Sequence, residues 1–244
     1  MSDSVAGGRR VRFGVSTYSF WQFKNEGLRD VGECLDRAAA MGFDAVEILH
    51  RQMTAEDNGY LQGLKRRAFV NGLDLCGFAT HQGFVSPDAE ERQRNVDHTV
   101  RCIEMAYALG IPTVRVNTGR WGTSGSFDEL MANRGIEPAL PGHTEEEAFG
   151  WVVDGLAACV PAAERCGVTL GLENHWGLGR TAEGVRRIVE ELHTPWLRVT
   201  LDTGNFLEEP YESLEALADL TTYVHAKTYH GGYEAEGYAE EAKQ

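Results

Sequence analysis

The chain lacks a hydrophobic run long enough to span a membrane. A transmembrane helix needs about 20 consecutive apolar residues, and no segment of the 244 residues approaches that length. The first ten residues, MSDSVAGGRR, also lack the apolar stretch of a secretory signal. We therefore expect a cytoplasmic protein with no membrane partner.

Paired cysteines are absent as well. The five cysteines are odd in number, and none belongs to a Cys-x-x-Cys motif. This pattern excludes the usual zinc-ribbon and dithiol redox motifs. It predicts buried free thiols, as are common in a reducing compartment.

Positive charge is scarce. The chain has 23 Lys and Arg against 37 Asp and Glu, a formal net charge of −14. Because nucleic-acid binding depends on neutralising phosphates with basic side chains, this balance argues against a nucleic-acid partner. The 42% of hydrophobic residues is ordinary for a soluble domain with a sizeable core.

Four glycines mark repeated junctions between a helix and a strand. Each follows a stretch with helical spacing of apolar residues and precedes a short apolar run: Gly42, Gly72, Gly110 and Gly167. Glycine ends helices in the left-handed conformation, and a strand that follows a helix repeatedly indicates a wound parallel sheet. We expect an α/β fold of the TIM (β/α)8 type.

The apolar runs predict seven strands, and none is left for an eighth. The strands are expected near residues 11–16, 43–49, 73–79, 111–117, 168–173, 197–202 and 222–227. The corresponding domains are a flexible N-terminus (1–10), a barrel (11–230) and a polar tail (231–244). A barrel that lacks its eighth strand and final helices exposes strand edges, which favours association. Several explanations fit this pattern: a truncated gene, a second chain that completes the barrel, or a degenerate binding protein. A homo-oligomer is also compatible with it.

Two local features refine the helices. Thr144 and Glu147 form a capping-box pattern at the start of a helix, and Pro161 is expected to kink or split that helix. Residues 118–141 have no sustained period and are expected to form a long surface loop.

Three expected strands end at side chains that can bind a metal. Glu173, Asp202 and His225 lie 29 and 23 residues apart, which is enough for a helix between parallel strands. In a barrel, the loops after the strands build the active site. This oxygen and nitrogen donor set suits Mn²⁺, Co²⁺, Mg²⁺ or Zn²⁺. The alternative is that each residue caps a helix or pairs with an arginine.

Other polar and aromatic residues follow the same strand ends. Lys227 shares a strand face with His225, so it either neutralises a substrate anion or forms a salt bridge with a neighbouring carboxylate. The further candidates for contact with substrate are His81, His175, Asn205 and Trp176. For Trp176, plain packing is the alternative.

The motifs around these residues resemble the xylose isomerase-like TIM-barrel superfamily, the sugar phosphate isomerase/epimerase group. They are Gly171-Leu-Glu-Asn-His175, Leu201-Asp-Thr-Gly-Asn205 and Val224-His-Ala-Lys227. The resemblance implies one divalent metal held by Glu173, Asp202, His225 and a glutamate on the eighth strand, for which this chain has no counterpart. It also implies that Glu173 is half of a catalytic acid/base pair.

These observations predict a metal-dependent isomerase or epimerase of a small sugar, sugar phosphate or polyol-derived keto compound. Glu173 is the expected base and metal ligand, and Lys227 is expected to assist at the substrate. The alternatives are a metal-dependent lyase or dehydratase and a non-catalytic or partner-completed subunit. An endonuclease is disfavoured because Asn205 stands where several relatives have histidine.

Overall fold

The computed structural model describes residues 10–227. These residues divide into two compact units, one that ends at Cys76 and one that begins at Gly77. Both units alternate strands with helices, and the pairs β1–β2, β3–β4, β4–β5, β5–β6 and β6–β7 are parallel. The α/β class and the alternation predicted from the sequence are confirmed. The predicted absence of an eighth strand and the polar tail concern a segment that lies outside the described residues.

The first unit contains two complete strands and the start of a third. Its elements are β1 (Gly14–Ser16), α1 (Tyr18–Trp21), η1 (Glu26–Leu28), α2 (Val31–Ala40), β2 (Ala45–Leu49), η2 (His50–Gln52), α3 (Asn58–Val70) and the beginning of β3 (Asp74–Ala79). All five residues of β2 are buried, as expected for a strand covered on both faces.

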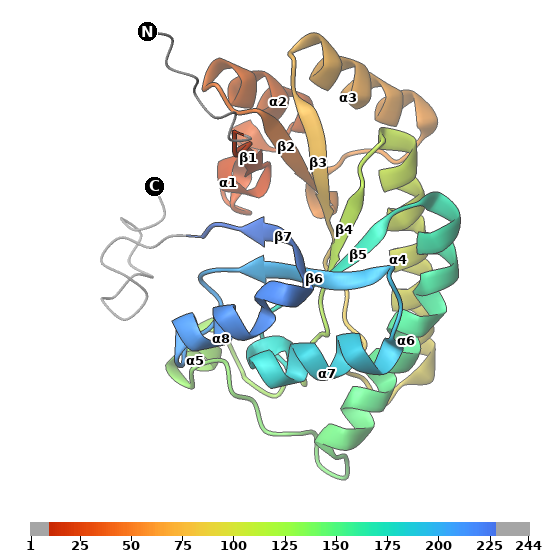
Figure 1. Cartoon of the computed structure of the whole chain (residues 1–244), viewed down its shortest axis with the longest axis vertical. Helices are drawn as coiled ribbons and strands as arrows, with labels where there is room; N and C mark the ends of the chain where they lie inside the picture. Colours follow the sequence, from red (N-terminus) through yellow and green to blue (C-terminus); the bar gives the residue numbers. More distant parts are fainter. Residues whose placement is uncertain (1–9, 228–244) are drawn as a thin grey trace, which may run out of the picture. The chain divides into compact units, whose positions relative to one another are not determined.

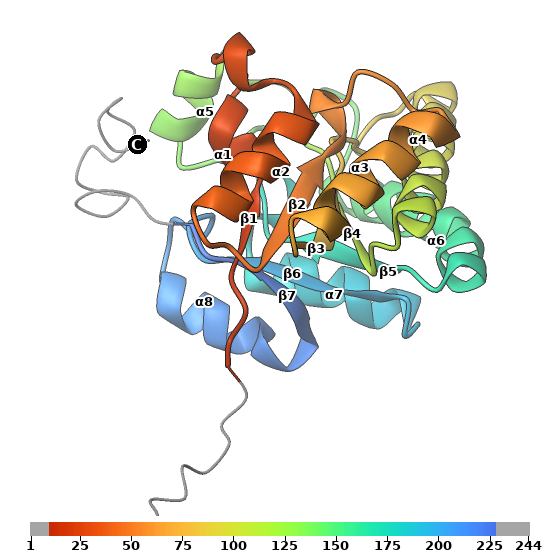
Figure 2. The same ribbon diagram turned by 90° about the horizontal axis from the view of Figure 1, so that it is seen from above.

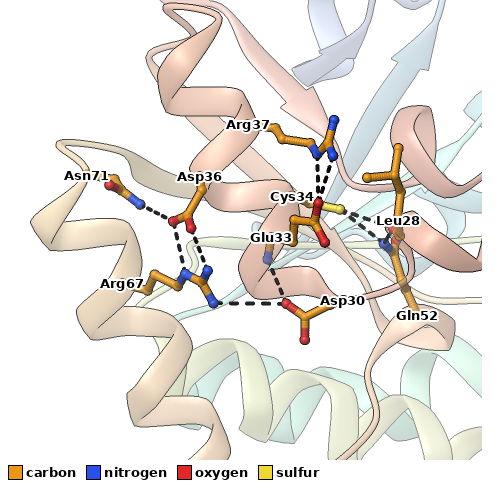
Figure 3. A network of polar contacts seen from close by, with 9 residues as sticks. All are labelled: Leu28, Asp30, Glu33, Cys34, Asp36, Arg37, Gln52, Arg67 and Asn71. Carbon is orange, nitrogen blue, oxygen red and sulfur yellow. Dashed lines mark hydrogen bonds and ion pairs between the residues drawn. The ribbon is translucent and has the colours of Figure 1, made fainter.

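A polar network joins α2 to α3 in this unit (Figure 3). The Asp36 carboxylate accepts from Arg67 Nε at 2.9 Å and from Asn71 Nδ2 at 2.8 Å. These hydrogen bonds lower the pKa of Asp36. The Gln52 amide donates to the Leu28 carbonyl at 3.0 Å. Side chains therefore fix the helices of this unit to one another beyond their apolar contact.

The second unit runs from the end of β3 to β7. Its elements are α4 (Ala89–Leu109), β4 (Thr113–Val116), α5 (Phe127–Ala132), α6 (Glu145–Cys166), β5 (Thr169–Glu173), η3 (Leu178–Arg180), α7 (Ala182–Leu192), β6 (Leu197–Asp202), α8 (Pro210–Leu217), η4 (Ala218–Leu220) and β7 (Thr221–His225). Figures 1 and 2 show α4 and α6 side by side on the outer side of β4 and β5. None of the helices among residues 10–227 has the length and apolarity to cross a membrane.

The four junction glycines have the predicted conformation. Their φ angles are 84° at Gly42, 69° at Gly72, 78° at Gly110 and 65° at Gly167. A side chain at these angles is strained, so glycine is needed for the chain to leave each helix and enter the next strand. The same device therefore starts β2, β3, β4 and β5.

Expectations about two segments of the second unit can be compared with the structure. The capping box of Thr144 and Glu147 is confirmed, and α6 continues through Pro161 as one helix, so of the two outcomes expected at this proline the split is wrong. Residues 118–141 are not a plain loop, because they contain α5, whose first turn is capped by the Ser126 side chain. A six-residue helix is too short to show a clear apolar period in the sequence.

The pairing of β6 with β7 contains an irregularity that matters for the site. Val199 pairs with Thr221, whereas the next residue, Thr200, pairs with Tyr223. One residue of β7 is therefore extra, and the shifted register places His225 opposite Asp202.

Candidate metal centre

Glu173, Asp202 and His225 converge at the ends of three adjacent strands. Each is the last residue of its strand, β5, β6 and β7. One donor atom from each lies within 4.8 Å of the other two. His225 Nδ1 is 3.0 Å from Glu173 Oε1 and 4.0 Å from Asp202 Oδ2. The predicted grouping of these three side chains is thus present in the structure.

The separations of the donor atoms fit one divalent ion. Donors bound to one ion at about 2.1 Å lie about 3.0 Å apart when adjacent in an octahedron and about 4.2 Å apart when opposite. Two carboxylates and one imidazole are ligands that Mn²⁺, Co²⁺ and Zn²⁺ accept. The residues present therefore match the metal that the sequence predicts, and they do not select one metal.

Arg115 provides a positive charge beside Glu173. It lies on β4, and its Nε is 3.6 Å from Glu173 Oε2, with the two side chains 11% and 3% exposed. The Asn117 amide is satisfied when its nitrogen donates to Glu173 Oε2 at 3.0 Å and its oxygen accepts from Arg115 Nη1 at 2.7 Å. Burial acts to raise the pKa of Glu173, but Arg115 and the hydrogen bond from His225 hold that pKa well below its usual value. Glu173 is a carboxylate, ready to bind a cation or accept a proton.

Lys227 forms the ion pair that the sequence left as one of two alternatives. Its Nζ is 2.8 Å from Asp202 Oδ2 and 2.7 Å from Asn205 Oδ1. Burial raises the pKa of Asp202, and the ammonium of Lys227 offsets part of that effect. The Lys227 side chain is 36% exposed, so its charge also reaches the solvent side of the site.

Buried asparagines lock the ends of β5 and β6 together. Asn174 Nδ2 donates to the Asp202 carbonyl at 2.9 Å, and Asn174 Oδ1 accepts from the Asp202 backbone N–H at 2.6 Å. Asn205 Nδ2 donates to the Asn174 carbonyl at 3.0 Å. Because these amides replace the strand hydrogen bonds that stop here, they fix the direction in which Glu173 and Asp202 project.

The other predicted contact residues lie in different settings. His175 is partly buried beside Trp176, with ring centroids 5.4 Å apart, and burial lowers its pKa to about 4, so it is neutral at pH 7. Trp176 packs in a buried cluster with Leu130 and Leu207. His81 is exposed and follows β3. Contact of these three residues with substrate stays a prediction.

A buried carboxylate organises residues 118–141. Glu137 is 3% exposed in its side chain and accepts from Arg120 Nη1 at 2.5 Å. The same carboxylate accepts from the backbone N–H groups of Gly122 at 3.3 Å and Ser124 at 3.1 Å. Both ends of this segment are thereby joined.

Close backbone contact holds the segment against its neighbours. A Cβ added at Gly177 would lie 1.9 Å from the Gly119 carbonyl oxygen, and one added at Gly119 would lie 2.6 Å from Gly83 Cα. No side chain fits at either position, so the loops after β3, β4 and β5 touch through glycine backbone. The segment is a packed part of the site region.

Arg115, Asn117 and Glu137 were not identified from the sequence. Arg115 gave a usable signal, because a charged residue within the apolar strand Thr-Val-Arg-Val needs a buried partner. Glu137 gave none, since a glutamate in a polar segment is ordinarily exposed.

Comparison with known proteins assigns the chain to a known fold. A family model described as xylose isomerase-like TIM barrel matches residues 35–237, whereas no curated protein matches the chain in sequence. The structure of 3-keto-D-glucoside 4-epimerase from E. coli is similar with a TM-score of 0.69 at 19% identity, over 88% of this chain and 78% of that one.

Two further solved structures resemble the chain. A D-tagatose 3-epimerase-like protein has a TM-score of 0.70 at 22% identity, over 91% of this chain and 78% of that one. The probable 3-DHS dehydratase AsbF from Bacillus anthracis has a TM-score of 0.66 at 15% identity, over 90% and 74%. At these identities the likeness shows the fold.

Proposed function

This chain belongs to the xylose isomerase-like TIM-barrel family, and we propose that it is a divalent-metal-dependent isomerase or epimerase of a small sugar, sugar phosphate or polyol-derived keto compound. The observation that carries the proposal is the convergence of Glu173, Asp202 and His225 at adjacent strand ends. Two solved structures of similar fold are named as an epimerase and an epimerase-like protein.

Each residue has a defined task in this proposal. Asp202 and His225 hold the metal with Glu173, and the metal when bound polarises a carbonyl or hydroxyl of the substrate. Glu173 takes the proton from the neighbouring carbon, because a carboxylate kept ionised by Arg115 is available as a base. Removal of a positioned base commonly costs about 100- to 10,000-fold in rate.

Further residues bind and orient the substrate. Lys227 supplies a positive charge and Asn205 an amide at the same side of the site, where the two side chains are already hydrogen-bonded. His175, being neutral, can donate or accept a hydrogen bond. His81 and Trp176 are proposed as outer contacts.

The test uses Glu173→Gln, with Glu164→Gln on the exposed face of α6 as the matched control. Purified protein is first analysed for bound metal and then screened with neutral keto sugars, keto sugar phosphates and inososes. We expect Glu173→Gln to lose at least 100-fold in turnover at saturating Mn²⁺, while the control keeps its activity. Wild-type turnover in Glu173→Gln would show that another group is the base.

A dehydratase is the second candidate, because a protein of similar fold is named as a probable dehydratase. It uses the same base, but the proton abstraction is followed by loss of a hydroxyl group. Product analysis separates the two reactions, since an epimerase conserves the mass of its substrate and a dehydratase releases water.

A further inference from the structure

The charges at the candidate metal centre are already balanced by the protein. Glu173 faces Arg115 at 3.6 Å, and Asp202 faces Lys227 at 2.8 Å. Nearby, the Arg120–Glu137 pair is neutral as a whole. Among residues 10–227, each carboxylate that would hold the cation therefore has a basic partner of its own.

A divalent cation disturbs this balance. With Glu173 and Asp202 compensated by two basic side chains, the bound ion adds a surplus of two positive charges. The two ligand carboxylates are 3% and 2% exposed, and uncompensated charge in such a setting is costly because water screens it poorly.

Lys227 is the basic group placed to meet an incoming anion. Arg115 is 11% exposed, whereas Lys227 is 36% exposed and donates a hydrogen bond to Asn205. Once a cation shares Asp202, the ammonium of Lys227 is only partly compensated by that carboxylate. The chain as a whole carries −14, so it does not attract anions in general, and a preference for them has to arise locally.

From this balance we propose that the metal-loaded site selects an anionic substrate, a keto sugar bearing a phosphate or a carboxylate, and that Lys227 pairs with the anionic group. The proposal rests on the metal-dependent function above and narrows its substrate class.

Binding to the Mn²⁺-loaded full chain tests the proposal. Bound Mn²⁺ is quantified first from the loss of the free-ion EPR signal. Calorimetry then compares fructose, fructose 6-phosphate and 5-ketogluconate, which are a neutral keto sugar, a phosphate and a carboxylate. The variants are Lys227→Met, Lys227→Arg and, as a matched loss of charge on the exposed face of α3, Lys65→Met.

We expect at least one anion to bind wild type about 10- to 100-fold more tightly than fructose, the range of one charged hydrogen bond. The phosphate and carboxylate arms show which anion is accepted. Lys227→Met should abolish this preference, while Lys227→Arg and Lys65→Met retain it.

Three results would overturn the proposal in distinguishable ways. If Mn²⁺ is bound but fructose binds as tightly as both anions, the substrate class is wrong and the metal-dependent function stands. If the preference for an anion survives in Lys227→Met, the pairing of Lys227 with the anionic group is wrong. If Mn²⁺ stays free in solution, the metal-dependent function fails and the anion preference fails with it.

Discussion

Gly171 and Thr200 form a tight contact between β5 and β6, directly below the candidate ligands. A Cβ added at Gly171 would lie 2.1 Å from Thr200 Oγ1 and 3.3 Å from Thr200 Cβ. Thr200 is fully buried, and its hydroxyl has no hydrogen-bond partner among the described residues. We predict that Gly171→Ala lowers the free energy of unfolding by about 2–3 kcal/mol, the cost of forcing a methyl group into a packed core.

The partner substitution gives this prediction its specificity. Thr200→Ala removes the clashing oxygen, and because that hydroxyl is unpaired its loss alone should cost less than about 1 kcal/mol. The double variant should then lie within about 1 kcal/mol of wild type, which corresponds to a coupling of at least about 1 kcal/mol. Urea unfolding followed by circular dichroism measures all four proteins.

Additive losses in the double variant would refute the reasoning. They would mean that Gly171→Ala acts on the strand backbone and not through Thr200. The contact matters for the site, since Glu173 and Asp202 lie two residues further along the same strands. Any spreading of β5 from β6 would separate the two carboxylates.

Two other predictions concern buried groups. Glu137→Gln removes the charge that pairs with Arg120. We expect the free energy of unfolding to fall by about 1–3 kcal/mol and residues 118–141 to be cleaved faster by proteases. Unchanged cleavage would contradict the proposed role of the carboxylate. Burial raises the pKa of the Cys159 thiol from its ordinary value of 9.0 to about 12. Between these two pH values only the unfolded chain loses the thiol proton, so the free energy of unfolding falls as the pH rises. At pH 10.5 the expected loss of unfolding free energy is about 2 kcal/mol. Urea unfolding of Cys159→Ala should lack this part of the loss. Equal pH dependence in wild type and in Cys159→Ala would refute the prediction.

The sequence predicts the strands and the three candidate ligands because local rules determine both. A left-handed glycine such as Gly167 ends a helix whatever lies around it, and an apolar run such as β5 is buried in any packed domain. Parallel strands bring their carboxyl ends to one edge, so Glu173 and Asp202 converge from topology alone.

What could not be predicted depends on contacts between distant segments. Arg115 on β4 faces Glu173 on the neighbouring strand β5, 58 residues later in the chain. Glu137 meets Arg120 across 17 residues of a segment without periodicity. The sequence is equally compatible with Trp176 in a pocket wall or in the core. In the structure its packing against Leu130 shows that it is buried.

The extra residue of β7 has a consequence for how the site tolerates changes in the length of the chain. Regular pairing of all the present residues from Val199 and Thr221 would bring Val224 opposite Asp202, and His225 would point away. Deleting Thr222 would remove the irregularity and leave His225 opposite Asp202 in a regular pair of strands. Losing one residue at this point of β7 therefore keeps the imidazole at the site, whereas losing a second one would shift the register and turn it away.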